Sequence, residues 1–174
     1  MLRRGIAILE RLRLAHDRRS ALALLPRRSR WRTTTIKQVS APFTGGCVCG
    51  AIRYECTAKP ITMFNCHCRD CQRTTGSAFS PVVYLPAKDF KITKGSPRYY
   101  STPSEMIGHN KRGYCSDCGS RLFGGASDEG QGILAASLDD PSLFKPEVHI
   151  WASDAQPWDH LDPALPRFEK YPPS

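Results

Sequence analysis

Residues 114–123 read YCSDCGSRLF, a pair of cysteines separated by two residues and followed directly by glycine. This arrangement favours a tight turn in which backbone N–H groups point at two thiolates, and Gly119 permits the positive φ angle that such a turn needs. A redox C-x-x-C pair normally begins a helix after a buried parallel strand, and no helical pattern follows here. We therefore interpret the stretch as a zinc knuckle that supplies two of the four ligands of a structural site.

The partner of this knuckle is predicted in residues 45–56, GGCVCGAIRYEC, which we interpret as containing a strand over residues 47–56. Side chains on a strand alternate between two faces, so Cys47 and Cys49 are expected to share one face. Cys56 falls on the other face and is favoured as a small apolar core residue, the alternative being a metal ligand. The residues expected on this core face are Val48, Ile52, Tyr54 and Cys56.

Joining the two stretches gives a closed zinc site that ties two distant parts of the domain together. Its four predicted ligands are Cys47, Cys49, Cys115 and Cys118. Apparent binding free energies of about 10–16 kcal/mol for structural zinc would make this site a large share of the stability of the fold.

The remaining cysteine cluster lies in residues 65–79, NCHCRDCQRTTGSAF, and offers three thiols. Cys66 and Cys68 are expected on one face of a strand, and the C-x-x-C spacing to Cys71 turns the chain so that a third sulfur converges. His67 would point to the opposite face and is not expected to bind the metal. Three protein ligands and one open position are typical of catalytic zinc, and a thiolate-rich open site suits a sulfur ligand. A second structural zinc, completed by water or by another side chain, is the alternative at this point.

The chain of 174 residues carries a net charge of +9, and this charge resides in its first 40 residues. Residues 1–40 contain eleven Lys and Arg and two acidic residues, whereas residues 41–174 contain fourteen of each and are neutral. The folded part has no net charge to attract phosphates, so nucleic-acid binding by the domain is not expected. The tight spacing of the eight cysteines favours a reduced, intracellular metalloprotein over a secreted disulfide scaffold.

The Arg-rich segment 1–42 is excluded from the fold prediction, and the zinc-binding domain is predicted over residues 43–174. Apolar residues recur at helical spacing between its arginines, which resembles a mitochondrial presequence; the alternatives are a disordered tail or a translation start placed too early. The longest aliphatic run, residues 21–25, is far short of a membrane span, so no membrane helix is expected. We expect a cytoplasmic protein, or a mitochondrial one if this segment acts as a presequence.

After residue 43 the sequence consists of short β-type segments broken by Gly and Pro, without a sustained helical period. This pattern predicts a single, mostly antiparallel β domain. The expected strands are residues 47–56, 62–67, 79–85, 97–101, 105–114, 120–124, 132–138 and 147–152. Residues 155–174 contain five prolines and are expected to follow the surface without regular structure.

The motifs GGCVCGAIRYEC, FNCHCRDCQRTTGSAF, YCSDCGSRLF and PEVHIWASDAQPW together resemble the family of glutathione-dependent formaldehyde-activating enzymes, which also includes centromere protein V. The resemblance covers about residues 43–170. It implies a β-tent fold of packed antiparallel sheets with two zinc sites. The implied structural ligands are Cys47, Cys49, Cys115 and Cys118, and the implied catalytic ones are Cys66, Cys68 and Cys71. The resemblance also implies a cleft lined by Gly76, Ser77, Ala78 and Phe79, with Trp151 and Trp158 as pocket walls or as packing residues.

The activity implied by this resemblance is that of a carbon–sulfur lyase, which forms or cleaves S-hydroxymethylglutathione with glutathione as cosubstrate and formaldehyde as the small aldehyde. Zinc at the second cluster would lower the pKa of the cosubstrate thiol beside a carbonyl group. Arg69 and Arg73 are candidates for binding glutathione carboxylates, or are ordinary surface residues. The competing hypothesis is a non-catalytic zinc-binding interaction module or a thiol-binding carrier, since a fold does not fix a function.

Overall fold

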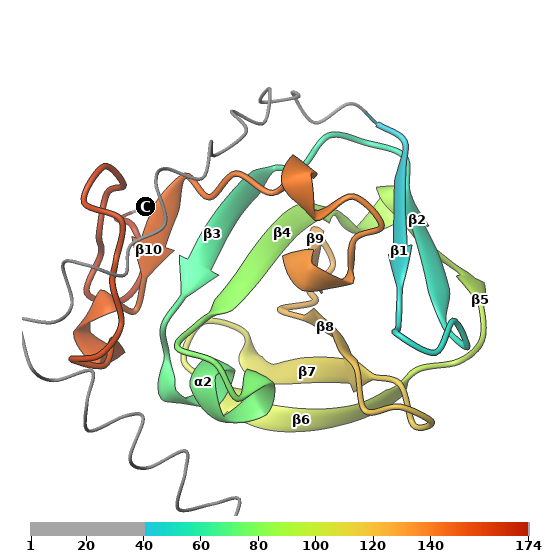
Figure 1. Ribbon diagram of the computed structural model, residues 1–174, viewed down its shortest axis with the longest axis horizontal. Helices are drawn as coiled ribbons and strands as arrows, with labels where there is room; N and C mark the ends of the chain where they lie inside the picture. The colour runs from blue at the N-terminus through green and yellow to red at the C-terminus, as the bar shows by residue number, and fades with distance from the viewer. Residues whose placement is uncertain (1–40, 174) are drawn as a thin grey trace, which may run out of the picture. The chain divides into compact units, whose positions relative to one another are not determined.

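Short strands joined by turns build two sheets in the computed structural model, which describes residues 41–173 (Figure 1). The small sheet has the order β1-β2-β5 and is antiparallel throughout. Its strands are β1 (Phe43–Gly46), β2 (Arg53–Cys56) and β5 (Phe90–Lys94). The hypothesis of a presequence or tail concerns residues 1–42, of which only the last two belong to the described part.

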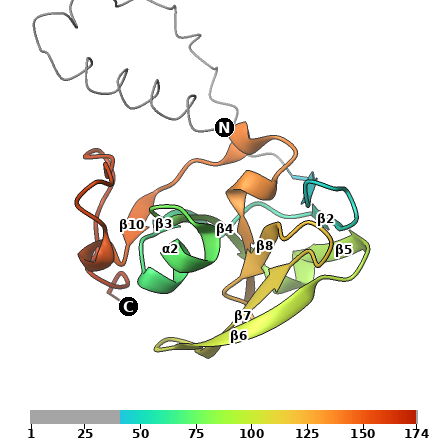
Figure 2. The same ribbon diagram turned by 60° about the horizontal axis from the view of Figure 1, so that its bottom comes forward.

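The large sheet has seven strands in the order β10-β3-β4-β9-β8-β7-β6. Neighbouring strands are antiparallel except for β10 and β3, which pair in parallel. The strands are β3 (Thr62–Cys66), β4 (Ser80–Pro86), β6 (Arg98–Ser104), β7 (Gly108–Tyr114), β8 (Arg121–Gly124), β9 (Gly130–Leu134) and β10 (Val148–Ile150). The sheet curls so that the β6–β7 hairpin lies beside helix α2 (Arg69–Thr75), as Figures 1 and 2 show. The prediction of a mostly β fold with packed antiparallel sheets is confirmed.

The hydrophobic core lies between the small sheet and the middle strands of the large one. Tyr54 of β2 is fully buried, and its ring meets that of Phe123 of β8 edge-on, with 5.5 Å between the centroids. Its hydroxyl lies 2.7 Å from that of Ser137, so the polar end of the ring is hydrogen-bonded inside the core. Phe90 of β5 packs against Phe123 at 5.1 Å. Burying such a ring contributes about 1.5–3 kcal/mol, so these contacts hold the two sheets together.

The first half of the predicted strand over residues 47–56 is wrong, because the chain turns between β1 and β2. The N–H of Cys47 donates to the carbonyl of Ile52 (3.1 Å), and the N–H of Gly50 donates to the carbonyl of Cys47 (3.0 Å). Gly50 has a φ of 73°, which few other residues adopt, so the chain can reverse there. Val48, expected in the core, is therefore 87% exposed. The predicted alternation holds only farther on, where the buried residues are Ile52, Tyr54 and Cys56.

Helix α2 was not predicted, because its seven residues are too few to establish a helical period. The local signals lie at its ends: Cys68 caps its first turn, and Gly76 ends it with a left-handed φ of 67°. The remaining helical segments are 3-10 turns, namely η2 (Ala87–Asp89), η3 (Ala135–Ser137), η4 (Pro141–Leu143) and η5 (Ala152–Asp154). Between residues 41 and 173, none of these helices has the length and apolar character needed to cross a membrane.

Strands β1 and β5 were also missed, since each is short and mixes polar with apolar residues. The other seven predicted strands correspond to β3, β4 and β6 through β10, with ends displaced by up to four residues. As the prolines predicted, residues 155–173 form no helix or extended strand. They run along β10 through hydrogen bonds from the N–H of Phe168 to the carbonyl of His149 (3.0 Å) and from the N–H of Trp151 to the carbonyl of Lys170 (2.8 Å).

Gly132 of β9 faces Gly124 of β8 in register, and this close approach yields a stability prediction. A Cβ atom on Gly132 would lie 2.4 Å from the carbonyl oxygen of Gly124, a backbone atom that cannot rotate away. We expect Gly132→Ala to lower the free energy of unfolding by about 1–3 kcal/mol in a denaturant titration. Gly124→Ala is the matched control, because its Cβ would meet its nearest neighbours at ordinary distances of 3.5 and 3.6 Å. Equal stability of the two variants would contradict this packing.

Candidate metal centres and the cavities beside them

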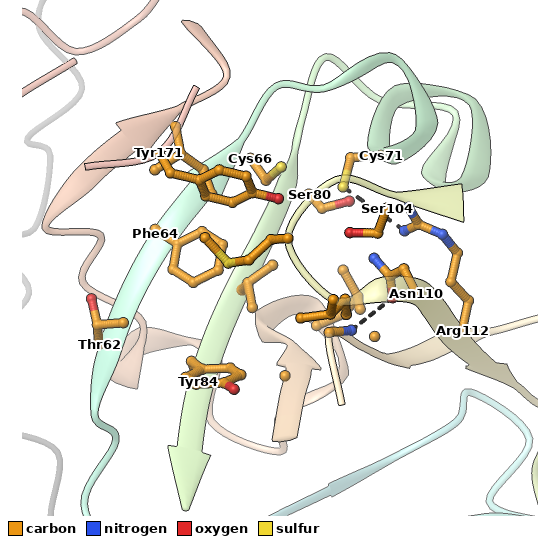
Figure 3. A pocket seen from close by; sticks show the side chains of 18 of the residues that line it. Thr62, Phe64, Cys66, Cys71, Ser80, Tyr84, Ser104, Asn110, Arg112 and Tyr171 are labelled. Atoms are coloured by element: carbon orange, nitrogen blue, oxygen red, sulfur yellow. Dashed lines mark hydrogen bonds between the residues drawn. The ribbon is translucent and has the colours of Figure 1, made fainter. Parts of the chain in front are cut away.

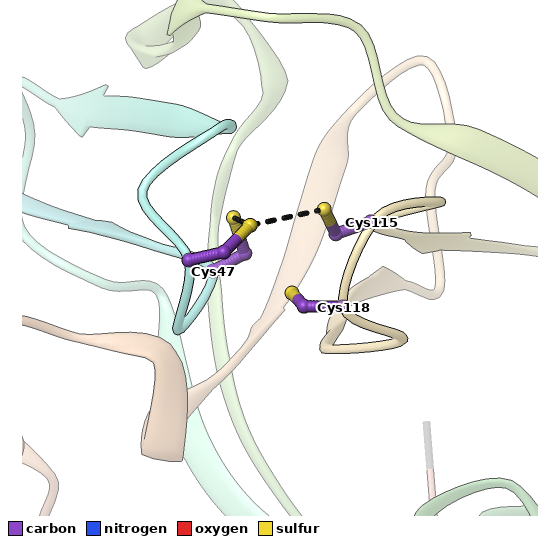
Figure 4. Close-up of side chains that lie close together, drawn as sticks. Cys47, Cys115 and Cys118 are labelled. Carbon is purple, nitrogen blue, oxygen red and sulfur yellow. Dashed lines mark hydrogen bonds between the residues drawn. The ribbon is translucent and has the colours of Figure 1, made fainter.

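Two turns, one from each sheet, bring four cysteine sulfurs together (Figure 4). Cys47 and Cys49 lie between β1 and β2, and Cys115 and Cys118 lie between β7 and β8. Their Sγ atoms lie within 4.8 Å of one another, with 3.4 Å between Cys47 and Cys49 and 3.8 Å between Cys49 and Cys115. Zinc–sulfur bonds of about 2.3 Å at tetrahedral angles place sulfurs about 3.8 Å apart, so this donor set fits a zinc ion.

Backbone and hydroxyl groups of the two turns point at these sulfurs. The N–H of Ile52 donates to Sγ of Cys47 at 3.2 Å. The hydroxyl of Ser120 lies 3.2 Å from Sγ of Cys118, and hydrogen bonding by Ser120 lowers the pKa of Cys118 to about 6. Gly119 has a φ of 74°, the left-handed conformation that the sequence predicts for this position. The hydrogen bonding at Cys118 therefore favours the thiolate form that a metal requires.

A second group of three sulfurs lies where β3 leads into α2. Cys66 ends β3, Cys68 caps α2, and Cys71 lies in the first turn of α2; their Sγ atoms are within 4.8 Å of one another. The prediction that Cys66 and Cys68 share a strand face is wrong, because the strand ends at Cys66 and the start of the helix makes the sulfurs converge. The N–H of Cys71 lies 3.4 Å from Sγ of Cys68. This donor set fits a zinc ion that takes its fourth ligand from outside the group.

Arg112 of β7 brings a positive charge to the three sulfurs, and the sequence analysis did not identify it. The residue is 3% exposed, and its Nη1 lies 3.9 Å from Sγ of Cys71. Its other nitrogens are held by Thr102 (3.2 Å, from Nε) and Asp70 (3.6 Å, from Nη2). Hydrogen bonds from the other two thiols, first that of Cys66, lower the pKa of Cys71, and the charge of Arg112 adds to this effect. The group therefore favours a thiolate at Cys71.

His67 lies between the first two cysteines of this group and is fully buried. Its Nε2 lies 2.8 Å from Nδ1 of His149, and its Nδ1 lies 2.9 Å from a carboxylate oxygen of Asp159. Burial lowers the pKa of His67, while the charge of Asp159 raises it. The carbonyl of His67 also accepts a hydrogen bond from Nε2 of Gln72. These three contacts hold both the ring and the carbonyl of His67, which fixes the backbone between Cys66 and Cys68.

Two cavities meet at the three-sulfur group. The first, of about 300 Å³, we call the apolar cavity (Figure 3). Its apolar side chains are Phe64, Val82, Met106, Ile107, Leu134, Val148 and Ile150. The second, of about 260 Å³, we call the polar cavity, because its wall includes Arg69, Asp70, Glu105 and Asp154. The residues that line both are Cys66, Cys71, Ser104, Asn110, Arg112 and Tyr171.

Among the other residues that the sequence analysis singled out, Trp151 and Arg69 line the polar cavity. Gly76, Ser77, Ala78 and Phe79 are absent from the walls of both cavities. Gly76 and Ser77 are exposed after α2, whereas the ring of Phe79 packs against His67 at 5.3 Å. Arg73 is exposed and lines neither cavity, and Trp158 is 63% exposed.

The family model of the glutathione-dependent formaldehyde-activating enzyme matches residues 42–154. The chain belongs to this family. Over 107 residues it is 31% identical to a Talaromyces marneffei protein named for the same family, with 56% of each chain covered. A Penicillium rubens protein named likewise is 29% identical over 124 residues, which cover 68% of this chain and 59% of that protein. The chain thus spans a little over half the length of the curated relatives it matches.

A similar solved structure is that of a Rhodobacter sphaeroides protein. It is 20% identical in sequence, aligns with a TM-score of 0.45, and covers 55% of this chain and 87% of its own. Membership of the family, which the cysteine motifs indicate by resemblance, is confirmed by the family model.

The four-cysteine group yields a prediction about metal content. Cys118→Ser removes one of four thiols at the junction of the sheets, so elemental analysis should find one zinc fewer per chain, and the melting temperature should fall. Cys56→Ala is the matched control: Cys56 is fully buried in the main core and belongs to neither sulfur group. It should keep its metal and lose only about 1–2 kcal/mol of stability. A Cys118→Ser protein with unchanged metal content would show that the group is not a metal site.

Proposed function

We propose that this domain catalyses the reversible addition of a thiol to a carbonyl compound, as a carbon–sulfur lyase acting on S-hydroxymethylglutathione. Glutathione is the thiol and formaldehyde the carbonyl compound in this proposal. The observation that carries it is the position of Cys66 and Cys71, which line both cavities. Two reactants could therefore reach one group of sulfurs from two sides, which favours their reaction through proximity. The family name of the matching model supports the same reactants.

The proposed reaction forms one bond and moves one proton. The thiol loses its proton, its sulfur attacks the carbonyl carbon, and the carbonyl oxygen takes up a proton as the C=O double bond becomes a single bond. The reverse reaction cleaves the carbon–sulfur bond and restores the aldehyde and the thiol. No oxidant or reductant is needed, because the addition of a thiol to a carbonyl group involves no net transfer of electrons.

The three cysteines are the proposed holders of a zinc ion, which when bound would lower the pKa of a thiol at its fourth position. Within residues 41–173, the group of potential ligands at this place consists of Cys66, Cys68 and Cys71 alone. His67 is engaged by His149 and Asp159 instead. This supports a vacancy for a substrate thiol over a closed structural site.

The polar cavity is the proposed place for glutathione, which carries two carboxylates and an ammonium group. Arg69 and Arg112 supply positive charge there, and Asp70, Glu105 and Asp154 supply negative charge. A wall with both signs suits a ligand with both signs. Trp151 would pack against the tripeptide backbone. Arg73, which lies outside both cavities, has no such support as a glutathione-binding residue.

The proposal predicts that Cys68→Ser abolishes catalysis. Removing one of three thiols should reduce the rate of S-hydroxymethylglutathione formation by at least about a hundredfold, since metal-site ligands and their partners commonly affect activity on this scale. The rate is measured above the spontaneous reaction by NMR exchange spectroscopy on mixtures of formaldehyde and glutathione. Cys56→Ala is the control and should react at the rate of the unmodified protein. Wild-type rates in Cys68→Ser would exclude the cluster as the catalyst.

Native mass spectrometry, combined with the NMR rate measurement on the same preparation, separates this proposal from a non-catalytic module or a thiol carrier. An enzyme should bind glutathione in the zinc-loaded state and accelerate the reaction. A carrier would bind glutathione without accelerating it, and an interaction module would do neither. Each outcome is read from the same preparation, so metal content and thiol binding are compared directly.

A further inference from the structure

The apolar cavity is far larger than a one-carbon aldehyde requires. Its volume of about 300 Å³ lies at the lower end of the range for sites that enclose small organic ligands. In Figure 3 it extends from Cys66 and Cys71 past Phe64 to Thr62 and Tyr84. Formaldehyde has two non-hydrogen atoms and would leave most of this wall without a contact. The cavity therefore suits a molecule with an apolar body.

The apolar character of this wall argues against glutathione as its occupant. Its apolar side chains include Phe64 of β3, Val82 of β4 and Val148 of β10. A charged tripeptide would lose water there without gaining matching polar contacts. An aromatic or branched aliphatic group would instead gain stability from the apolar surface that it buries.

One charged residue in the wall of the apolar cavity lacks a carboxylate partner among the described residues. Arg121 of β8 lines the cavity, and its Nε and Nη1 are shielded from solvent without a hydrogen-bond partner among residues 41–173. Its Nη2 lies beside Gly124, another wall residue. Tyr100 is its neighbour: the guanidinium carbon lies 5.8 Å from the centre of the tyrosine ring, and the two side chains also form a hydrogen bond. In the described part of the chain, no carboxylate lies within ion-pair distance of Arg121.

Arg121 lines the same cavity as Cys66 and Cys71. Burial lowers the pKa of Arg121, the charge of Tyr100 raises it, and the charge of Arg112 lowers it. The neighbouring Arg112 is already engaged with Thr102, Asp70 and Cys71. Arg121 is half-buried, and shielding its Nε and Nη1 from water without acceptors is costly, so a ligand carboxylate that accepts from them would relieve that cost.

We propose that the apolar cavity binds a 2-oxo acid with an aromatic or branched aliphatic body, whose carboxylate pairs with Arg121. In such a compound the carboxylate is bonded directly to the carbonyl carbon, so pairing with Arg121 brings that carbon into the cavity that Cys66 and Cys71 also line, with the body against its apolar side chains. This inference rests on the proposed function for its reaction. The thiol sulfur bonds to C2, the C2 oxygen takes up the proton that the thiol released, and a hemithioketal forms.

The proposal is tested by the binding of three matched probes to the zinc-loaded full chain without any thiol, measured by titration calorimetry. The first probe, 2-oxo-4-phenylbutanoate, has both the ring and the carboxylate. The second, 4-phenylbutan-2-one, replaces the carboxylate with a methyl group, and the third, pyruvate, lacks the ring. The first should bind at least about tenfold more tightly than either of the others, because it alone makes both contacts.

Arg121→Gln should weaken the binding of 2-oxo-4-phenylbutanoate by at least about tenfold and leave that of 4-phenylbutan-2-one unchanged. Arg98→Gln is the matched control, since Arg98 is an exposed arginine of β6 outside both cavities. Equal affinity for all three probes, no binding of the first probe, or an unchanged ratio in Arg121→Gln would each overturn the proposal. The probe comparison on the unmodified protein stands even if Arg121→Gln does not fold.

These measurements separate the two proposals because they need neither thiol nor turnover. If the three probes bind as expected but formaldehyde and glutathione do not react, the cavity assignment holds and the proposed reaction fails. If formaldehyde and glutathione react but 2-oxo-4-phenylbutanoate does not bind, the proposed function holds and the cavity assignment fails.

Discussion

The convergence of four cysteine sulfurs between two turns is the constraint on which the arrangement of the sheets depends. Cys49 and Cys115 are 66 residues apart in the chain, yet their sulfurs lie 3.8 Å apart. The small sheet has strands of four and five residues, which are marginal in isolation. Aromatic packing around Tyr54 holds it against the large sheet. A metal ion bound by the four thiols would join the two sheets at a second point.

The three-sulfur group depends on a different kind of support. Its backbone is fixed by buried polar contacts, chiefly those of His67 with His149 and Asp159. These contacts join β3, β10 and the irregular C-terminal segment behind the sulfurs. Buried polar groups of this kind specify one geometry because each member needs its partner. The proline-rich segment after β10 is thus part of the site's framework, although it has no regular structure.

Sequence patterns predicted the parts of this protein that follow from local chemistry. The glycine after Cys118 and the inward alternation from Ile52 to Cys56 could be predicted because spacing and residue type determine them. The turn at Gly50 and the short helix α2 could not, since hydrogen bonds over five residues leave no periodic pattern. Arg112 and Arg121 were not identified for another reason, since arginines on short strands are usually exposed. Arg112 is buried by contacts with Asp70 and Cys71, which lie far earlier in the chain, and such contacts leave no local pattern.

The residues shared by the two cavities separate an apolar compartment from a polar one beside the sulfurs. Val82, Leu134 and Val148 line the apolar cavity alone, and Arg69, Glu105 and Asp154 line the polar cavity alone. Substitutions on one side leave the contacts of the other intact. In proteins with this arrangement, substitutions in the apolar compartment can therefore change which molecule enters it, while the cysteines and the ligand of the polar compartment stay the same.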